Sequence, residues 1–155
     1  MEKRKIVFHL NCLEHGGAER VVSNLANQFG QEGYEVIVAT EWQGKDEFTL
    51  NPPVRREIVG LKPEDEKKSR VTRFLLRIKY LRKFLKKEKP DMVIAFMQRA
   101  NYRALTATWG TNIPVIVCCR NNPEVYYSAK SDKIQIRLLF PRAAGAVFQT
   151  YQQRD

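Results

Sequence analysis

The sequence contains no run of 18 or more consecutive apolar residues, so it predicts no membrane-spanning helix. Its basic start, MEKRKIVFHL, has an apolar stretch too short for a signal peptide and lacks a small-residue cleavage site, so we expect a first strand there. Cysteine is also scarce, with three residues and no framework spacing. Cys118 and Cys119 are adjacent in an apolar segment, which favours buried, reduced thiols in a cytosolic protein.

Acidic residues are few: 17 Asp and Glu stand against 27 Lys and Arg, which gives a formal net charge of +10. This surplus favours an anionic partner, which composition leaves open between nucleic acid, a phosphorylated substrate and an anionic membrane surface. The G-x-G-x-x-G fingerprint of dinucleotide sites and the G-K-[ST] of a P-loop are both missing. No Cys or carboxylate cluster with metal-ligand spacing surrounds His9 or His15, so we expect no metal site.

The composition and length predict a globular domain, since 43% of the 155 residues are apolar. Apolar patterning and Gly and Pro punctuation predict strands at residues 4–10, 34–40, 56–61, 91–97, 113–119 and 144–150. They predict helices from residue 17, over roughly 67–88, over 100–110 and within 131–143. This alternation predicts a three-layer α/β fold, with a mainly parallel sheet in the order 3-2-1-4-5-6 and helices on both faces.

In such a sheet, ligands bind outside the carboxyl ends of the strands. The loops expected there carry NCLEHGG, EWQGK, MQRAN, CRNNPE and QTYQQ. Gly16 and Gly17 fall where the first helix begins. They form either a turn that needs positive φ or a helix N-terminus that a phosphate approaches closely. His15 is a candidate substrate contact, and Glu19 in the first turn of the helix suits the helix dipole.

The segment GGAERVVSNLANQF, directly after a first strand, resembles the GGAER signature of glycosyltransferase family 4. EKPDMVIAFM, IPVIVCCRNNP and PRAAGAVFQT resemble further segments of that family in the same order, so the resemblance covers essentially the whole chain. It implies one of the two Rossmann-like domains of a retaining GT-B enzyme. Residues 1–155 would be the N-terminal, acceptor-side domain. The family's nucleotide-sugar domain carries two glutamates eight positions apart, and no glutamate pair here has that spacing.

The resemblance also implies site residues. Gly16 and Gly17 would bring the first helix to the interdomain cleft, and Arg120 stands where many relatives have a cleft histidine. The residues expected to bind substrate or phosphate are Gly16, Gly17, His15, Arg120, Asn121 and Asn122. Gln98 and Asn101 are expected in the acceptor cleft, with a plain helix N-cap as the alternative for Asn101.

The implied activity is sugar transfer from a nucleotide-diphosphate sugar to a glycan or polyprenyl-linked acceptor, in bacterial cell-surface polysaccharide synthesis. No cofactor and no metal are implied, and the protein would be cytoplasmic, with peripheral contact at the inner face of the membrane. Because the donor domain is missing, we expect this chain alone to be inactive. The alternative is a stand-alone Rossmann-like module that binds a phosphorylated ligand or an anionic membrane without catalysis.

Residues 67–89 contain 11 Lys or Arg and one acid, Glu88. Two explanations remain open for this predicted helix: a solvated face and an interfacial helix on anionic headgroups. We expect no nucleic-acid partner, because the aromatic residues are too sparse for a stacking platform and no recognised binding motif is present. The arc predicted to face the sheet is Val71, Phe74, Leu75, Ile78, Leu81 and Leu85. On the opposite side, beside Leu76, the residues predicted to face a membrane are Arg73, Arg77, Tyr80, Lys83, Phe84 and Lys87.

Overall fold

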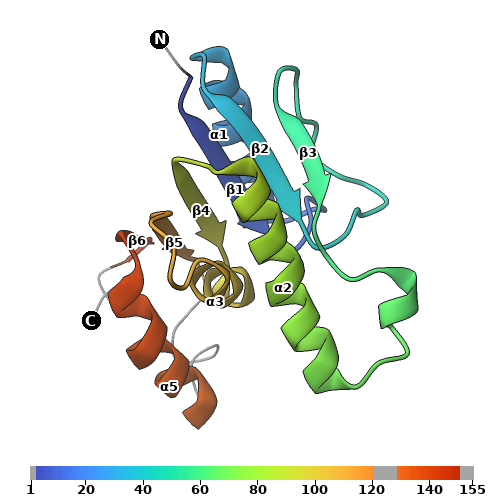
Figure 1. Ribbon diagram of the computed structural model, residues 1–155. Coiled ribbons are helices and arrows are strands. Elements are labelled where there is room, and N and C mark those ends of the chain that lie inside the picture. The colour runs from blue at the N-terminus through green and yellow to red at the C-terminus, as the bar shows by residue number, and fades with distance from the viewer. Residues whose placement is uncertain (1–2, 121–128, 151–155) are drawn as a thin grey trace.

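The computed structural model describes residues 3–120 and 129–150 and shows a three-layer α/β domain (Figure 1). The strands are β1 (Lys5–Leu10), β2 (Glu35–Thr40), β3 (Arg55–Ile58), β4 (Met92–Phe96), β5 (Val115–Cys119) and β6 (Gly145–Phe148). The helices are α1 (Gly17–Gln31), α2 (Arg70–Glu88), α3 (Gln98–Ala107) and α5 (Lys130–Leu139), with short 3-10 turns at Pro63–Asp65 and Phe140–Arg142.

The six strands form one sheet in the order β3-β2-β1-β4-β5-β6, and every neighbouring pair is parallel. The predicted order is therefore confirmed, including the contact of β1 with β4, in which Phe8 lies opposite Ile94. The strand order reverses between β1 and β4, so the carboxyl ends of these two strands mark the switch point where sheets of this kind bind ligands.

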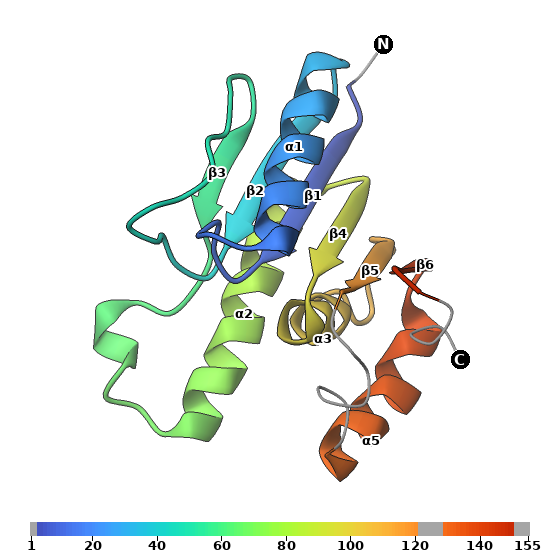
Figure 2. The ribbon, with the colours of Figure 1, turned by 180° about the vertical axis from the view of Figure 1, so that it is seen from behind.

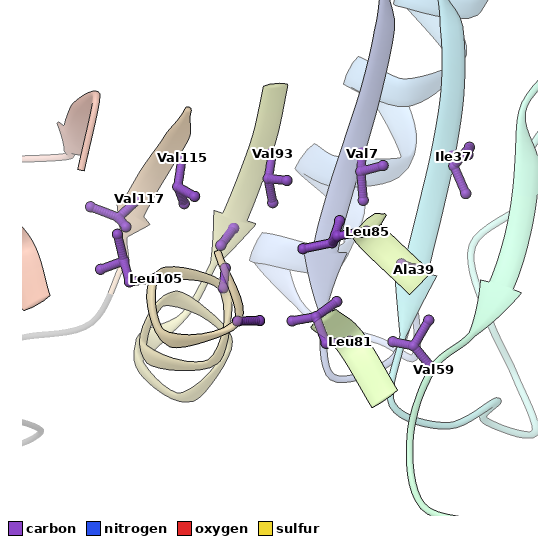
Figure 3. Close-up of a cluster of buried hydrophobic side chains, with 13 residues drawn as sticks. Val7, Ile37, Ala39, Val59, Leu81, Leu85, Val93, Leu105, Val115 and Val117 are labelled. Carbon is purple, nitrogen blue, oxygen red and sulfur yellow. The ribbon is translucent and has the colours of Figure 1, made fainter. Parts of the chain in front are cut away.

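The sheet has an apolar core on each face because both faces are covered. Helix α1 covers one face, while α2, α3 and α5 lie on the other side (Figures 1 and 2). Figure 3 shows the cluster on the α2 and α3 side, where Leu81, Leu85 and Leu105 pack against strand residues such as Val7 and Val93. Burial of strand residues on both faces explains their nearly continuous apolar sequences.

Two helix starts differ from the sequence-based expectation for local reasons. Helix α2 begins at residue 70 because the Ser69 hydroxyl accepts a hydrogen bond from the Thr72 N–H at 3.2 Å and caps the helix. Helix α3 leaves β4 through Met97, whose φ of 77° is rare for a residue with a side chain. Asn101 therefore lies inside α3, and the expectation that it caps the helix is wrong.

The third strand is also displaced, to Arg55–Ile58, and ends before Gly60. At Gly60 the backbone passes directly over β2's exit, since a Cβ there would lie 1.8 Å from the carbonyl oxygen of Glu41. This close approach turns the chain away from the sheet and leads it toward α2.

Candidate functional site

A cavity of about 560 Å³ opens at the carboxyl edge of the sheet, among residues of α2, α3 and α5. On this side α2 and α5 extend beyond the ends of the strands (Figure 1). The chain segments that leave β1, β2 and β4 add the remaining walls. The lining residues are Asn11, Trp42, Arg70, Arg73, Phe74, Arg77, Gln98, Arg99, Tyr102, Arg103, Asp132 and Gln135.

Five of the twelve lining residues are arginines, and Asp132 is the single acid among them. Within residues 3–120 and 129–150, Arg70, Arg73 and Arg99 form no ion pair, so their charges are available to a ligand. Guanidinium groups present several N–H donors in a planar fork that matches phosphate oxygens. The cavity therefore suits a phosphate or diphosphate group.

A buried carboxylate lies beneath this cavity. Glu41 follows β2, and its side chain is fully buried. Its Oε2 accepts a hydrogen bond from Arg77 Nη1 at 2.5 Å, and its Oε1 lies 3.1 Å from Arg103 Nε. Arg103 Nη2 donates to the Asn11 side-chain oxygen. Groups from α2, α3 and the exits of β1 and β2 thus form one charged network.

His9 in β1 completes the network from below. Its Nδ1 lies 3.0 Å from the Ala39 carbonyl oxygen and donates to it, so Nε2 is the acceptor for Arg103 Nε at 3.3 Å. Burial, and secondarily the charge of Arg103, lowers the pKa of His9 to about 3. Burial also lowers the pKa of Arg103 to about 10, so Arg103 stays charged and His9 stays neutral at pH 7.

A second cavity of about 390 Å³ adjoins the first, because the two share Trp42, Arg73 and Arg77. Glu41, Leu61 and Glu66 complete its lining. The Trp42 side chain is half-exposed and belongs to both cavities, so it presents an aromatic wall beside the arginines. Aromatic walls with a few polar groups are typical of ligand sites.

The structure excludes one of the two explanations for the glycine pair, the turn that needs positive φ. Gly16 is extended, with φ −171°, and the positive-φ glycines of the described chain are Gly33 and Gly110, so the positive-φ turn is wrong. A Cβ at Gly16 would lie 2.0 Å from a Glu19 carboxylate oxygen, whereas a Cβ at Gly17 would meet nothing within 4 Å. The Glu19 carboxylate therefore lies against the start of α1, and Gly17 leaves that helix end open.

Of the remaining candidates, Gln98 lines the large cavity. Asn101 is fully buried and donates from Nδ2 to the Cys118 carbonyl oxygen at 3.1 Å, so it supports β5 and does not reach the cleft. His15 is exposed and lies 3.8 Å from Asp46. Arg120, after β5, lies beside Gln149, whose amide oxygen accepts from Arg120 Nη2 at 2.7 Å when the amide is oriented to satisfy both groups. Asn121 and Asn122 lie outside the described residues.

The predicted membrane-facing row of α2 is wrong for three residues. Phe84 packs against the core cluster, and the Tyr80 hydroxyl donates to Asp65 Oδ2 at 2.8 Å. Arg77 turns to Glu41. Arg73 lines both cavities, which leaves Lys83 and Lys87 as exposed cations of that row.

The predicted core-facing arc of α2 is wrong in its first two turns. Val71, Phe74 and Leu75 are exposed because this part of the helix extends beyond the sheet, whereas Leu81 and Leu85 are buried as expected (Figure 1). The periodicity of α2 identified Leu81 and Leu85 as core residues but could not show where the sheet ends.

Sequence reasoning missed Arg103, Glu41, Asn11 and Trp42. A signal for one of them was present, since Arg103 interrupts a helix that is otherwise rich in alanine and packs on a buried sheet. A buried arginine needs a buried acid, and such an acid could be sought among the residues that follow the strands.

Two absences concern residues 3–120 and 129–150. No helix in that part of the chain is long and apolar enough to cross a bilayer. No group of three or more His, Cys, Asp and Glu side chains there is arranged to hold a metal ion. The thiols of Cys12, Cys118 and Cys119 are buried, as the sequence predicted for the adjacent pair.

Strand order, helix placement and the position of the cavity define a Rossmann-like domain whose large cavity lies at the carboxyl edge of the sheet. Residues 15–149 match Glycosyltransferase Family 4, and the chain belongs to that family. The resemblance inferred from the GGAER segment is thereby confirmed.

Among curated proteins, the chain is similar to the GalNAc-alpha-(1->4)-GalNAc-alpha-(1->3)-diNAcBac-PP-undecaprenol alpha-1,4-N-acetyl-D-galactosaminyltransferase of Campylobacter jejuni. The two are 28% identical over 137 residues, which is 88% of this chain and 38% of that protein. Sucrose-phosphate synthase from Thermosynechococcus elongatus shares the fold with a TM-score of 0.74 at 10% identity, over 98% of this chain and 44% of that one.

MurG of Acinetobacter baumannii also shares the fold, with a TM-score of 0.67 at 13% identity, over 96% of this chain and 42% of that one. The chain thus spans less than half the length of each of these relatives. At such low identities the two structural likenesses concern the fold alone.

Proposed function

We propose that this chain is the acceptor-side domain, N-terminal in position, of a retaining glycosyltransferase. The enzyme moves a sugar from a nucleotide-diphosphate sugar to a glycan or lipid-linked acceptor in bacterial cell-surface polysaccharide synthesis. The observation that carries the proposal is the five-arginine cavity at the carboxyl edge of a family 4 domain. The acceptor of the Campylobacter relative, as its name states, is linked through PP to undecaprenol.

In this proposal the two anionic partners bind at different places. The arginine cavity holds the phosphate or diphosphate of the acceptor, while the open helix end at Gly17 faces the diphosphate of the donor. A nucleotide-sugar domain outside this chain supplies the rest of the donor site. The bond from the sugar's anomeric carbon to the diphosphate breaks, the acceptor hydroxyl forms the new bond on the same face, and its proton leaves with the diphosphate.

Peripheral contact with an anionic membrane is part of the proposal, and exposed apolar side chains at the start of α2 support it. Val71, Phe74 and Leu75 are exposed in the first two turns of α2, with Arg70 and Arg73 alongside. Apolar groups that insert beside basic groups are typical of interfacial helices, and each basic residue near an anionic surface contributes about 1 kcal/mol. The three buried cysteine thiols suit the reducing cytoplasm.

The test uses the full-length protein that contains this chain, with a series of UDP-sugars and an undecaprenyl-diphosphate-linked saccharide as acceptor. Mass spectrometry should detect the acceptor with one added sugar. The isolated 155-residue chain should give no transfer and should bind UDP-sugars weakly and without preference for the base. Micromolar, base-specific binding by the isolated chain would show that the donor site has been misplaced.

The stand-alone module is the second candidate, favoured by the same cavity, since anion binding needs no second domain. The two differ in turnover. Sugar transfer by the full-length protein supports the enzyme, whereas diphosphate binding without transfer from any nucleotide sugar supports the module.

A further inference from the structure

Contacts hold both the backbone and the side chain of Glu41, the residue that directly follows β2. The Glu41 backbone N–H donates to the Asn11 carbonyl oxygen at 2.9 Å, and the chain at Gly60 lies directly against the Glu41 carbonyl oxygen. The side chain is fully buried between an arginine of α2 and an arginine of α3. Both of those arginines line the large cavity.

Each of the two guanidinium groups uses part of its donors on the network. Arg77 donates through Nη1 to Glu41. Arg103 donates through Nε to His9 and through Nη2 to Asn11, and its Nε also forms an ion pair with Glu41 Oε1 at 3.1 Å. Arg77 Nε and Nη2 and Arg103 Nη1 have no protein partner within residues 3–120 and 129–150. The network therefore fixes one side of each fork and leaves the other side for a ligand.

We infer that Glu41 is a positioning residue of the anion site: it holds Arg77 and Arg103, from two different helices, at the orientation and separation that bind the acceptor's phosphate or diphosphate. The inference rests on the function proposed above, because it assigns a task within that same cavity. It goes further in naming a negatively charged residue as a requirement for binding a negatively charged ligand.

A purely stabilising role explains these contacts poorly. A buried ion pair loses much of its electrostatic attraction to desolvation, and apolar groups of similar volume stabilise a fold as well or better. Glu41 Oε1 also lacks a hydrogen-bond donor of good geometry, so the site is not arranged to satisfy the carboxylate fully. Fixing charged side chains before the ligand arrives lowers the cost of ordering them at binding.

Electrostatics alone and positioning predict opposite signs for the removal of this charge. If Glu41 acts only as a charge, neutralising it makes the cavity more positive and tightens anion binding. If it positions the arginines, Glu41→Gln weakens binding, because a glutamine amide has one acceptor oxygen and turns an NH₂ donor toward the second guanidinium.

Asp132 supplies the matched control. It is a half-buried acid that lines the same cavity, and it forms no ion pair in the described part of the chain. Asp132→Asn changes the net charge by the same amount as Glu41→Gln without touching the network. It should therefore tighten anion binding by a small factor.

The experiment is calorimetric titration of the 155-residue chain with inorganic pyrophosphate at pH 7 and low salt. We expect Glu41→Gln to weaken binding about tenfold, in line with the loss of one charge-assisted hydrogen bond. Glu41→Asp, which keeps the charge but shortens the reach, should fall between Glu41→Gln and the native chain. Thermal unfolding of each variant reports on the fold separately, and Glu41→Asp carries the test if Glu41→Gln does not fold.

The outcomes separate the two levels of the proposal. Tighter binding by both Glu41→Gln and Asp132→Asn overturns the positioning role and leaves the anion site intact. Unchanged binding by folded Glu41 variants overturns it as well, with Glu41 then serving stability alone. Absence of pyrophosphate binding by the native chain removes the anion site itself, and the proposed function with it.

Discussion

The glycine turn before α1 and the arginine cavity beside α2 lie at the same edge of the sheet, yet they differ in charge. Around the turn, carboxylates dominate: Glu19 lies against Gly16, and Glu14 lies against Gly44. The cavity has five arginines and one half-buried acid. An open helix end is therefore not by itself an anion site. The positive charge of the cavity attracts an isolated phosphate more strongly than the glycine turn does.

The largest expected effect on stability comes from the removal of Arg103. Arg103→Ala removes a cavity charge and one of the two cations that face the buried Glu41 carboxylate, which should destabilise the fold by about 3 kcal/mol. Urea unfolding measures this free energy. Arg99→Ala removes an exposed arginine of the same cavity and should change stability by less than about 0.5 kcal/mol. Equal losses for the two variants would show that the network beneath the cavity is not special.

A second effect concerns acid. The pKa of His9 is about 3 in the folded state, below its ordinary value of 6.5. As the pH falls, the imidazole is therefore protonated in the unfolded chain at a higher pH than in the folded one. The stability from neutral His9 is complete above pH 6.5 and is lost as the pH falls toward 3, at about 1.4 kcal/mol per pH unit within that window. Urea unfolding at pH 7, 5.5 and 4.5 measures the free energy of unfolding. This free energy should fall less steeply with falling pH for His9→Asn than for the native chain. Identical slopes would contradict a buried neutral imidazole.

A third prediction sharpens the role of the unpaired cavity arginines. Replacing Arg70, Arg73 or Arg99 singly by alanine should weaken pyrophosphate binding about fivefold to tenfold each, because each removes a charge-assisted contact. Lys83→Ala and Lys87→Ala remove exposed cations elsewhere on α2 and should alter binding less than twofold. Calorimetry at two salt concentrations checks both sets, and equal losses from the lysines would reduce the site to the overall charge of the helix.

The smallest effects on stability belong to the glycine turn. Gly17→Ala places a Cβ in open space and should leave the free energy of unfolding unchanged or raise it by about 0.5 kcal/mol. Sugar transfer by the full-length protein should nevertheless fall, because the added methyl group obstructs the donor's diphosphate. Gly16→Ala meets only the flexible end of Glu19 and serves as the control. Unimpaired transfer by Gly17→Ala would leave the turn without a ligand.

The fold was predictable because its signals are local and repeated. Buried strands such as Met92–Phe96 alternate with amphipathic helices, and this alternation fixes a parallel sheet and its order. The cavity was not predictable in the same way. Glu41 follows β2 and Arg103 lies in α3, which follows β4, so the two meet only after β2 and β4 pair with the two edges of β1. No spacing along the chain predicts that contact. Likewise, the exposure of Phe74 depends on where the sheet ends and not on the periodicity of α2.

The most direct test of the account is a nuclear magnetic resonance titration of the ¹⁵N-labelled chain with inorganic pyrophosphate. The titration follows arginine side-chain N–H signals and backbone amides together. The account predicts saturable shifts of the cavity arginines, Arg73, Arg77 and Arg99 among them, with little change at the Gly17 and Ala18 amides. Shifts confined to the amides at the start of α1, with silent arginines, would contradict it and place the anion at the glycine turn.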